Sequence, residues 1–147
     1  MSKKYDSLKL EKQLCFPLYA ASREVNKLYH PLLSELNLTY TQYIVMLVLW
    51  ETNPITEKEM GKKLYLDSGT LTPVLKSLEA KNYIGRSRSK EDERVVIVTL
   101  TEEGIALKDK ATAVPEQLGS CINLSEEDSM HLYALLYKLL GNLEDEK

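Results

Sequence analysis

Residues 64–79, LYLDSGTLTPVLKSLE, decide the fold. Asp67 precedes small residues and then apolar residues at helical spacing, so we expect it to cap the helix that follows. The preceding residues 56–64 begin with a Thr followed three positions later by Glu59, a pattern that predicts a short helix with its own N-cap. Two helices joined by a tight turn are therefore expected here. The apolar stripe of the second helix consists of Leu71, Val74, Leu75 and Leu78.

The periodicity changes after Asn82. Residues 84–89, IGRSRS, predict a short strand with Arg86 and Arg88 on one face. Residues 90–94 form a charged turn, and the β-branched residues 95–100, VVIVTL, predict a second strand. A short helix, a turn, a second helix and a hairpin with a basic tip together indicate a winged helix-turn-helix.

Helical patterns also precede this module. The first runs from about residue 8 to residue 36 and contains Pro17 and Pro31, either of which can kink or split a helix. Residues 39–42, TYTQ, are a capping box that opens the next helix, which ends at Asn53-Pro54.

We therefore expect a single, mainly α domain with a small β-hairpin wing. Residues 101–122 and 125–140 predict two further helices. The flanking helices, about residues 1–38 and 102–147, are expected to dimerise, and about residues 39–101 to form the DNA-binding module. A homodimer suits this arrangement because two recognition helices meet successive major grooves of a palindromic site in double-stranded DNA.

Composition is that of an ordinary globular protein, with 147 residues, 44% hydrophobic residues and 28% charged residues. It excludes a disordered chain and a disulfide scaffold, and no stretch predicts a membrane span or a signal peptide, so the cytoplasm is expected. The net charge is −3, yet residues 62–94 hold eight Lys and Arg against five acids. This basic middle indicates either a polyanion-binding module or a solvated charged face.

Two cysteines, Cys15 and Cys121, and two histidines are present, without CxxC or zinc-ligand spacing. We expect no metal site, and no hydrolase signature surrounds Cys15.

Tyrosines recur at helical spacing after Cys15. On an unbroken helix, Tyr19 and Tyr29 lie about 40° to either side of Cys15. Their hydroxyls could donate to a thiolate, which would then attack a peroxide O–O bond and become a sulfenic acid. The alternative is that Cys15 is a small buried hydrophobic residue and the tyrosines belong to the core.

Several segments together resemble the MarR family of winged-helix transcription regulators, and most of all its organic-hydroperoxide-sensing OhrR branch with the related staphylococcal redox regulators. The resemblance covers essentially the whole chain. It is carried by residues 64–79, by RSRSKEDER (86–94) and LTEEG (100–104), and by QLCF (13–16), Tyr19, Tyr29 and LTYTQY (38–43).

The resemblance implies a DNA-reading surface on the second helix of the module and on the hairpin. Short hydroxyls near the helix start reach phosphates or base edges, and basic side chains contact the backbone. The hairpin arginine enters the minor groove while an acid two residues earlier holds it. Ser77 departs from several relatives, which carry Arg there. The implied residues are Asp67, Ser68, Thr70, Thr72, Lys76, Arg86, Arg88, Asp92 and Arg94.

The resemblance also implies a repressor that is released when Cys15 is oxidised by an organic hydroperoxide or a related oxidant. Tyr19, Tyr29 and Tyr40 would complete the sensing site, Tyr40 from across the dimer. Cys121 matches the branch members that resolve the sulfenic acid through an intersubunit disulfide. Pro17 departs from the family pattern near the thiol. No cofactor is expected, because the thiol itself is the sensor.

Three alternatives remain open. The first is a repressor of the same family released by a small phenolic-type ligand, with the cysteines not sensing. The second is an enzyme, a thiol peroxidase, although no CxxC or βαβ pattern supports it. The third is a module that docks its basic hairpin on an acidic protein.

Overall fold

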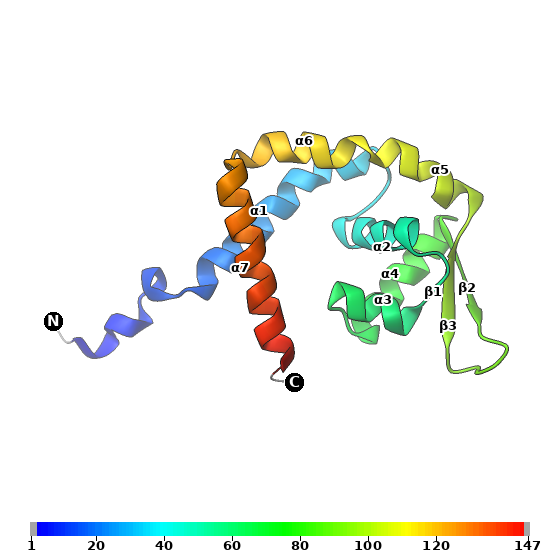
Figure 1. Cartoon of the computed structure of the whole chain (residues 1–147), viewed down its shortest axis with the longest axis horizontal. Helices are drawn as coiled ribbons and strands as arrows, with labels where there is room; N and C mark the ends of the chain where they lie inside the picture. Colours follow the sequence, from blue (N-terminus) through cyan, green and yellow to red (C-terminus); the bar gives the residue numbers. More distant parts are fainter. Residues whose placement is uncertain (1–2, 146–147) are drawn as a thin grey trace.

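Seven α-helices and three short strands follow one another along residues 3–145, the part of the chain that the computed structural model describes (Figure 1). Two 3₁₀ segments, Lys3–Leu8 and Leu10–Lys12, precede the first α-helix. The elements that follow are α1 (Cys15–Ser34), α2 (Tyr40–Glu51), β1 (Ile55–Thr56), α3 (Glu57–Leu64), α4 (Ser68–Ala80), β2 (Ile84–Arg88), β3 (Val96–Leu100), α5 (Glu102–Ala111), α6 (Ala113–Ile122) and α7 (Glu126–Asp145).

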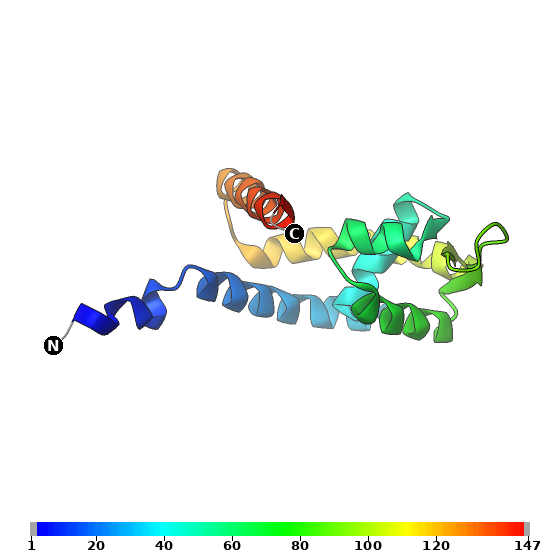
Figure 2. The same cartoon turned by 90° about the horizontal axis from the view of Figure 1, so that it is seen from below.

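The start of α1 differs from the expected helix over residues 8–36. Residues 3–14 form an arm that extends away from the rest of the chain in both views (Figures 1 and 2). Pro17 is the third residue of α1, where a backbone N–H has no intrahelical acceptor, so its ring is compatible with the helix start. Pro31 lies inside α1 and removes one hydrogen bond without ending the helix.

The strands form one antiparallel sheet in the order β1-β3-β2. The expected hairpin is present, with Ile84 opposite Leu100 and Arg88 opposite Val96. The short strand β1 was not predicted. It pairs Ile55 with Val98.

The turn between α3 and α4 is set by close backbone contact. Leu66 N–H donates to the carbonyl of Gly61 at 2.9 Å, and a Cβ at position 61 would lie 2.7 Å from the carbonyl oxygen of Leu66. Tyr65 takes a left-handed conformation with φ 57°. Asp67 then caps α4, as the sequence predicts, because its Oδ1 accepts from Thr70 N–H at 2.8 Å.

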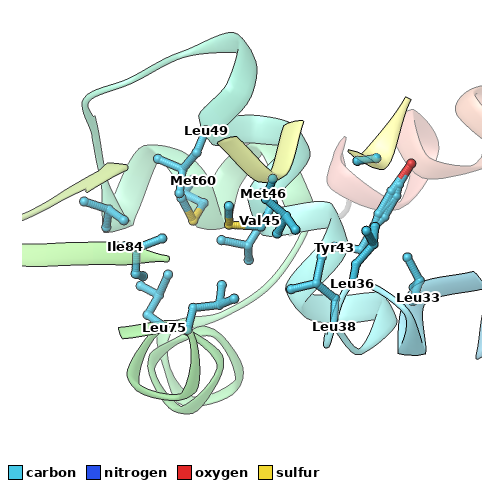
Figure 3. Close-up of a cluster of buried hydrophobic side chains, with 14 of the residues drawn as sticks. Leu33, Leu36, Leu38, Tyr43, Val45, Met46, Leu49, Met60, Leu75 and Ile84 are labelled. Atoms are coloured by element: carbon cyan, nitrogen blue, oxygen red, sulfur yellow. The ribbon is translucent and has the colours of Figure 1, made fainter. Parts of the chain in front are cut away.

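The hydrophobic core lies between α2, α3, α4 and the sheet, and it continues to the end of α1 and to α5 and α6 (Figure 3). The stripe predicted for α4 is buried at Leu71, Leu75 and Leu78. Figure 3 shows Met46 of α2 and Met60 of α3 in the same cluster. The core therefore holds the recognition helix α4 against the rest of residues 39–101.

The C-terminal third is arranged as two arms. The helix expected over residues 101–122 is divided at Thr112 into α5 and α6, because Pro115 cannot donate a backbone hydrogen bond to Ala111. Helix α6 packs against α1, and α7 folds back from its end (Figure 1). None of the helices over residues 3–145 has the length and apolar character needed to cross a bilayer.

Helix α7 contributes nothing to the core of this chain, since none of its residues is buried. It nevertheless carries large apolar side chains, and the start of α1 does the same. The exposed apolar residues of these two helices include Phe16, Leu18, Tyr19, Met130, Leu132, Tyr133, Leu135, Tyr137, Leu139 and Leu143.

Candidate nucleic-acid interface and thiol site

The first turn of α4 presents small polar side chains to solvent. Ser68 and Thr70 are exposed, and so is Lys76 further along the helix. The hydrogen bond from Thr70 N–H lowers the pKa of the Asp67 carboxyl, so the N-cap carries a negative charge. Thr72 is different, because it is half-buried and its hydroxyl donates to Glu57 Oε1 at 2.5 Å. Thr72 therefore links α4 to α3 in this structure.

The tip of the wing is organised by two arginines. Arg94 donates through Nε to Asp92 Oδ1 and through Nη2 to Asp92 Oδ2, both at 3.1 Å. This bidentate pair lowers the pKa of the Asp92 carboxyl, while the Arg94 side chain stays 91% exposed. Arg88 donates to the backbone carbonyl of Glu93 at 3.2 Å and closes the turn. The expected Asp92–Arg94 pair is thus formed.

Arg86 does not share this exposure. It lies on the same face of β2 as Ile84 and Arg88, midway between the buried Ile84 and the exposed Arg88, and its side chain is 20% exposed. Its Nη2 contacts Glu79 Oε1 of α4 at 3.1 Å. Its Nε is buried without a hydrogen-bond partner among residues 3–145. The strand alternation was predicted, but Arg86 joins the wing to the recognition helix in place of the expected phosphate-facing position.

Position 77 also lies inside the fold. Ser77 Oγ accepts a hydrogen bond from Gln42 Nε2 of α2 at 2.8 Å, so Ser77 faces α2.

A hollow of about 890 Å³ separates the start of α4 from the wing. Asp67 and Ser68 line it from α4, and Arg94 lines it from the wing. Lys58 and Lys62 line it from α3. Glu57, Glu59 and Glu144 line it as well, so the hollow has a mixed charge, and its cations lie beside the exposed first turn of α4.

Cys15 is the first residue of α1 and is exposed with a free thiol. No side chain in the described part of the chain hydrogen-bonds to its sulfur. Tyr19, one turn later, is 59% exposed, and its ring lies 5.6 Å below the guanidinium of Arg23. Cys121 lies near the end of α6, is also exposed and free, and donates its S–H to the carbonyl of Gln117 at 3.4 Å.

Three tyrosines cluster where α1 meets α2. The ring centroids of Tyr29 and Tyr40 are 4.7 Å apart, and those of Tyr29 and Tyr43 are 5.8 Å apart. Burial, together with the neighbouring phenols Tyr40 and Tyr43, raises the pKa of Tyr29 to about 12. Burial also raises the pKa of Tyr40 and of Tyr43. The cluster is therefore a set of neutral hydroxyl groups at any physiological pH.

Sequence reasoning placed Tyr29 and Tyr40 in one site but missed Tyr43. Tyr43 follows Tyr40 by three residues on α2, a spacing that places both on one face of the helix. It is 3% exposed and its ring meets Tyr40 edge-on.

Cys15 and the tyrosine cluster do not meet within one chain. Cys15 is at the start of α1 and Tyr29 lies fourteen residues later, which corresponds to about 21 Å along a helix axis. Ideal helix geometry keeps the two residues near one face of α1, but axial distance separates them.

No group of His, Cys, Asp and Glu side chains over residues 3–145 is arranged to hold a metal ion. The candidate residues are thus two thiols, a cluster of phenols, and the exposed polar side chains of α4 and the wing.

Comparison with known proteins identifies the family. Residues 27–111 match the transcriptional regulator SarA/Rot family. The chain is 52% identical, over 97% of each chain, to an organic hydroperoxide resistance transcriptional regulator of Bacillus subtilis (strain 168).

Solved structures of similar fold include proteins bound to DNA. The fold is similar to AbfR of Staphylococcus epidermidis in its reduced form bound to DNA, with a TM-score of 0.77 and 38% identity over 95% of this chain and 97% of that chain. The disulfide form of AbfR is less similar, with a TM-score of 0.63 and 37% identity over 97% of each chain. A cysteine variant of MarR from E. coli complexed with operator DNA has a TM-score of 0.80 and 27% identity, over 95% of this chain and 99% of that chain.

The winged helix-turn-helix, the thiol and tyrosine residues and these relatives lead to one conclusion: the chain belongs to the SarA/Rot family of MarR-type winged-helix transcriptional regulators, in the branch of the organic-hydroperoxide-resistance regulators, and is a DNA-binding regulator and not an enzyme.

Proposed function

We propose that the chain is a homodimeric repressor that leaves its operator when Cys15 is oxidised by an organic hydroperoxide or a related oxidant. The observation that carries the proposal is the free, exposed Cys15 at one end of α1 with a cluster of neutral tyrosines at the other end. The similarity to the organic hydroperoxide resistance regulator of Bacillus subtilis, and to AbfR with its reduced and disulfide forms, supports this interpretation.

A second subunit would complete the sensing site. Because Tyr29 lies about 21 Å from Cys15 in its own chain, only a partner whose α1 crosses this one could bring tyrosines to the thiol. Tyr29 and Tyr40 of the partner subunit would then donate hydroxyl hydrogen bonds to the sulfur, next to Tyr19 of the same chain. The exposed apolar side chains of α1 and α7 would be covered in the same dimer.

The chemistry needs only the thiol and the oxidant. The Cys15 thiolate attacks one oxygen of the hydroperoxide, the O–O bond breaks, and the sulfur becomes a sulfenic acid while the second oxygen leaves as an alcohol after taking a proton. The Cys121 thiol of the partner subunit then attacks the sulfenic sulfur. A disulfide forms and the sulfenic oxygen leaves as water.

Disulfide formation would require the two subunits to move. A disulfide needs Cα atoms within about 7 Å, and the two thiols lie on α1 and α6, the helices that would form the dimer interface. A rearrangement there would reset the spacing of the two α4 helices and so lower the affinity for the operator.

In the DNA-bound state, about residues 39–101 would form the reading module and the flanking helices the dimer. Ser68, Thr70 and Lys76 of α4 would face a major groove, and Arg94, held by Asp92, would enter the minor groove. The dimer would match a palindromic operator. A regulator with such a target works in the cytoplasm.

The test is fluorescence anisotropy of the reduced protein on duplex DNA from the region upstream of its own gene. We expect tight, salt-dependent binding, release after one equivalent of cumene hydroperoxide per subunit, and recovery with excess dithiothreitol. The Cys121→Ser variant should give no intersubunit disulfide on a non-reducing gel. Binding that hydroperoxide leaves unchanged would contradict the sensing proposal and favour a ligand-released regulator.

A further inference from the structure

One polar side chain is buried in the core of the winged helix-turn-helix. Gln42 of α2 is 5% exposed, and it is the only polar residue among the buried residues at positions 3–145. A buried amide is costly unless its hydrogen-bonding capacity is used, so its partners define what it does.

Gln42 joins three segments of the chain. Its amide oxygen accepts from Thr39 N–H at 3.0 Å, which completes the capping box of α2. The same oxygen accepts from Lys81 Nζ at 2.8 Å, and its amide nitrogen donates to Ser77 Oγ at 2.8 Å. Both lone pairs of the oxygen are occupied, so the orientation of the amide is determined by its partners.

The two long-range contacts of Gln42, with Ser77 and Lys81, both lead to the recognition helix. Ser77 lies in α4, and Lys81 is its C-cap residue, one turn later. Lys81 Nζ also donates to the carbonyl of Asn37 in the turn between α1 and α2, at 2.7 Å. Partial burial lowers the pKa of Lys81.

Gln42 lies in the first turn of α2, the turn that also carries two members of the tyrosine cluster, and projects from another face of that helix. Tyr40 and Tyr43 are its neighbours on α2, and Tyr29 contacts both from α1. A displacement of the first turn of α2 against α1 would therefore move Gln42 as well. The bonds to Ser77 and Lys81 must then either break or take α4 along, and breaking them is costly because the Gln42 side chain is buried.

We infer that Gln42, through Ser77 and Lys81, is a positioning residue that transmits the state of the tyrosine cluster to the recognition helix. This inference rests on the proposed redox function, since it assigns the route by which that signal reaches DNA. The exposed first turn of α4 is nine residues from Ser77 on one continuous helix, so a shift at Ser77 changes how Ser68 and Thr70 meet the groove.

Ser77→Ala removes the acceptor of the Gln42 amide, and Lys81→Met removes the bonds of Nζ to Gln42 and to the Asn37 carbonyl. Both variants leave the capping box intact. Ser77→Thr retains the hydroxyl and serves as the conservative replacement. Lys108→Met is the matched control, because Lys108 Nζ bonds to the carbonyl of Trp50 at 3.3 Å and joins α5 to α2 away from this network.

The measured quantity is the ratio of operator dissociation constants after and before treatment with one equivalent of cumene hydroperoxide, at fixed salt, with circular dichroism to confirm folding. Sulfenic acid or disulfide at Cys15 is followed by mass spectrometry. We expect Ser77→Ala and Lys81→Met to oxidise at the rate of the unmodified chain but to lower the ratio on the order of tenfold. Ser77→Thr and Lys108→Met should retain the ratio.

The outcomes separate the two proposals. If the unmodified chain shows no change on oxidation, the proposed redox function is wrong and the inference fails with it. If the unmodified chain responds, and folded Ser77→Ala and Lys81→Met respond to the same extent, the inference alone is overturned. A variant that weakens DNA binding equally before and after oxidation also overturns it, because that result indicates a structural role only.

Discussion

Cys15 and Tyr29 lie at the two ends of the same helix, about 21 Å apart along its axis, although both fall on one face of α1. A thiol that is to be activated by this tyrosine must therefore receive it from another chain. The sequence implied that only Tyr40 comes from across the dimer, and the axial distance leads us to propose the same origin for Tyr29.

Mixed dimers test this relationship. We predict that a subunit carrying Cys15→Ser, paired with one carrying Tyr29→Phe and Tyr40→Phe, reacts with hydroperoxide at the normal rate per remaining thiol. The homodimer with both tyrosine substitutions should react on the order of tenfold more slowly, because the thiolate loses two hydroxyl donors. The measurement is the rate of thiol loss. Equally slow reaction in the mixed dimer would show that the tyrosines act within their own chain.

The bidentate Asp92–Arg94 pair at the wing gives a second prediction. Arg94→Ala should lower both the operator affinity and, by about 2, the magnitude of the slope of log affinity against log salt, because each subunit of the proposed dimer loses one cation. Asp92→Asn should retain the slope but lose affinity for A·T-rich sequence, because the cation is present but no longer held in place.

The pH dependence of this pair follows from the lowered pKa of Asp92. Above the ordinary carboxyl range Asp92 is ionised and holds Arg94, and this interaction is lost only as the pH falls through the lowered pKa of Asp92. We therefore expect the Asp92–Arg94 pair to cause no change in operator affinity above about pH 5. Titration of anisotropy against pH, with Asp92→Asn as control, measures this. If the difference in operator affinity between the unmodified chain and Asp92→Asn became smaller from pH 8 to pH 6, this prediction would be contradicted.

Tyr29 gives a pH prediction at the alkaline end. Its pKa is about 12 in the fold against an ordinary 10.0, so the fold favours the neutral phenol. The resulting stabilisation is complete below about pH 10 and is lost as pH rises towards 12. In an alkaline titration followed by tyrosinate absorbance, the unmodified chain should show a step towards pH 12 that Tyr29→Phe lacks. If Tyr29→Phe showed the same step, the raised pKa would not belong to Tyr29.

Gly104 in the first turn of α5 gives a stability prediction. A Cβ there would lie 2.1 Å from the carbonyl oxygen of Tyr83, while the Gly104 carbonyl accepts from Trp50 Nε1 at 2.9 Å. Gly104→Ala should therefore lower the free energy of unfolding by about 1–3 kcal/mol. Gly119→Ala is the control, since nothing lies within 4 Å of its added Cβ, and it should be neutral or stabilising by up to about 1 kcal/mol. Urea unfolding at one protein concentration compares them.

Elements with local signals were predictable from the sequence. The N-caps at Thr39, Thr56, Asp67, Thr101 and Ser125 all receive the expected backbone hydrogen bonds, because a cap and its acceptor are three residues apart. The strand β1 was missed because two residues carry no periodicity and its partner, β3, lies some forty residues away. Helix α1 starts late because Pro17 fits only its first turn.

The candidate site was predictable only in its chemistry. Spacing placed Arg86 and Arg88 on one strand face but could not show that Glu79, from another element, would hold Arg86 inside. Likewise, Gln42 was recognised as half of a capping box, whereas its contacts with Ser77 and Lys81 depend on tertiary packing. The axial distance between Cys15 and Tyr29 became decisive only once α1 was seen to be continuous.

The most direct measurement compares the unmodified chain with Cys15→Ser, both reduced and both bound to the same labelled operator duplex, during titration with cumene hydroperoxide. Serine keeps the size of the side chain and removes the nucleophile, so the two proteins should bind DNA equally before oxidant is added. We predict that the unmodified chain is released at about one equivalent per subunit, as expected for stoichiometric thiol oxidation, and that Cys15→Ser stays bound. Release of Cys15→Ser at the same hydroperoxide concentration would contradict the account, because the signal would then enter somewhere other than this thiol.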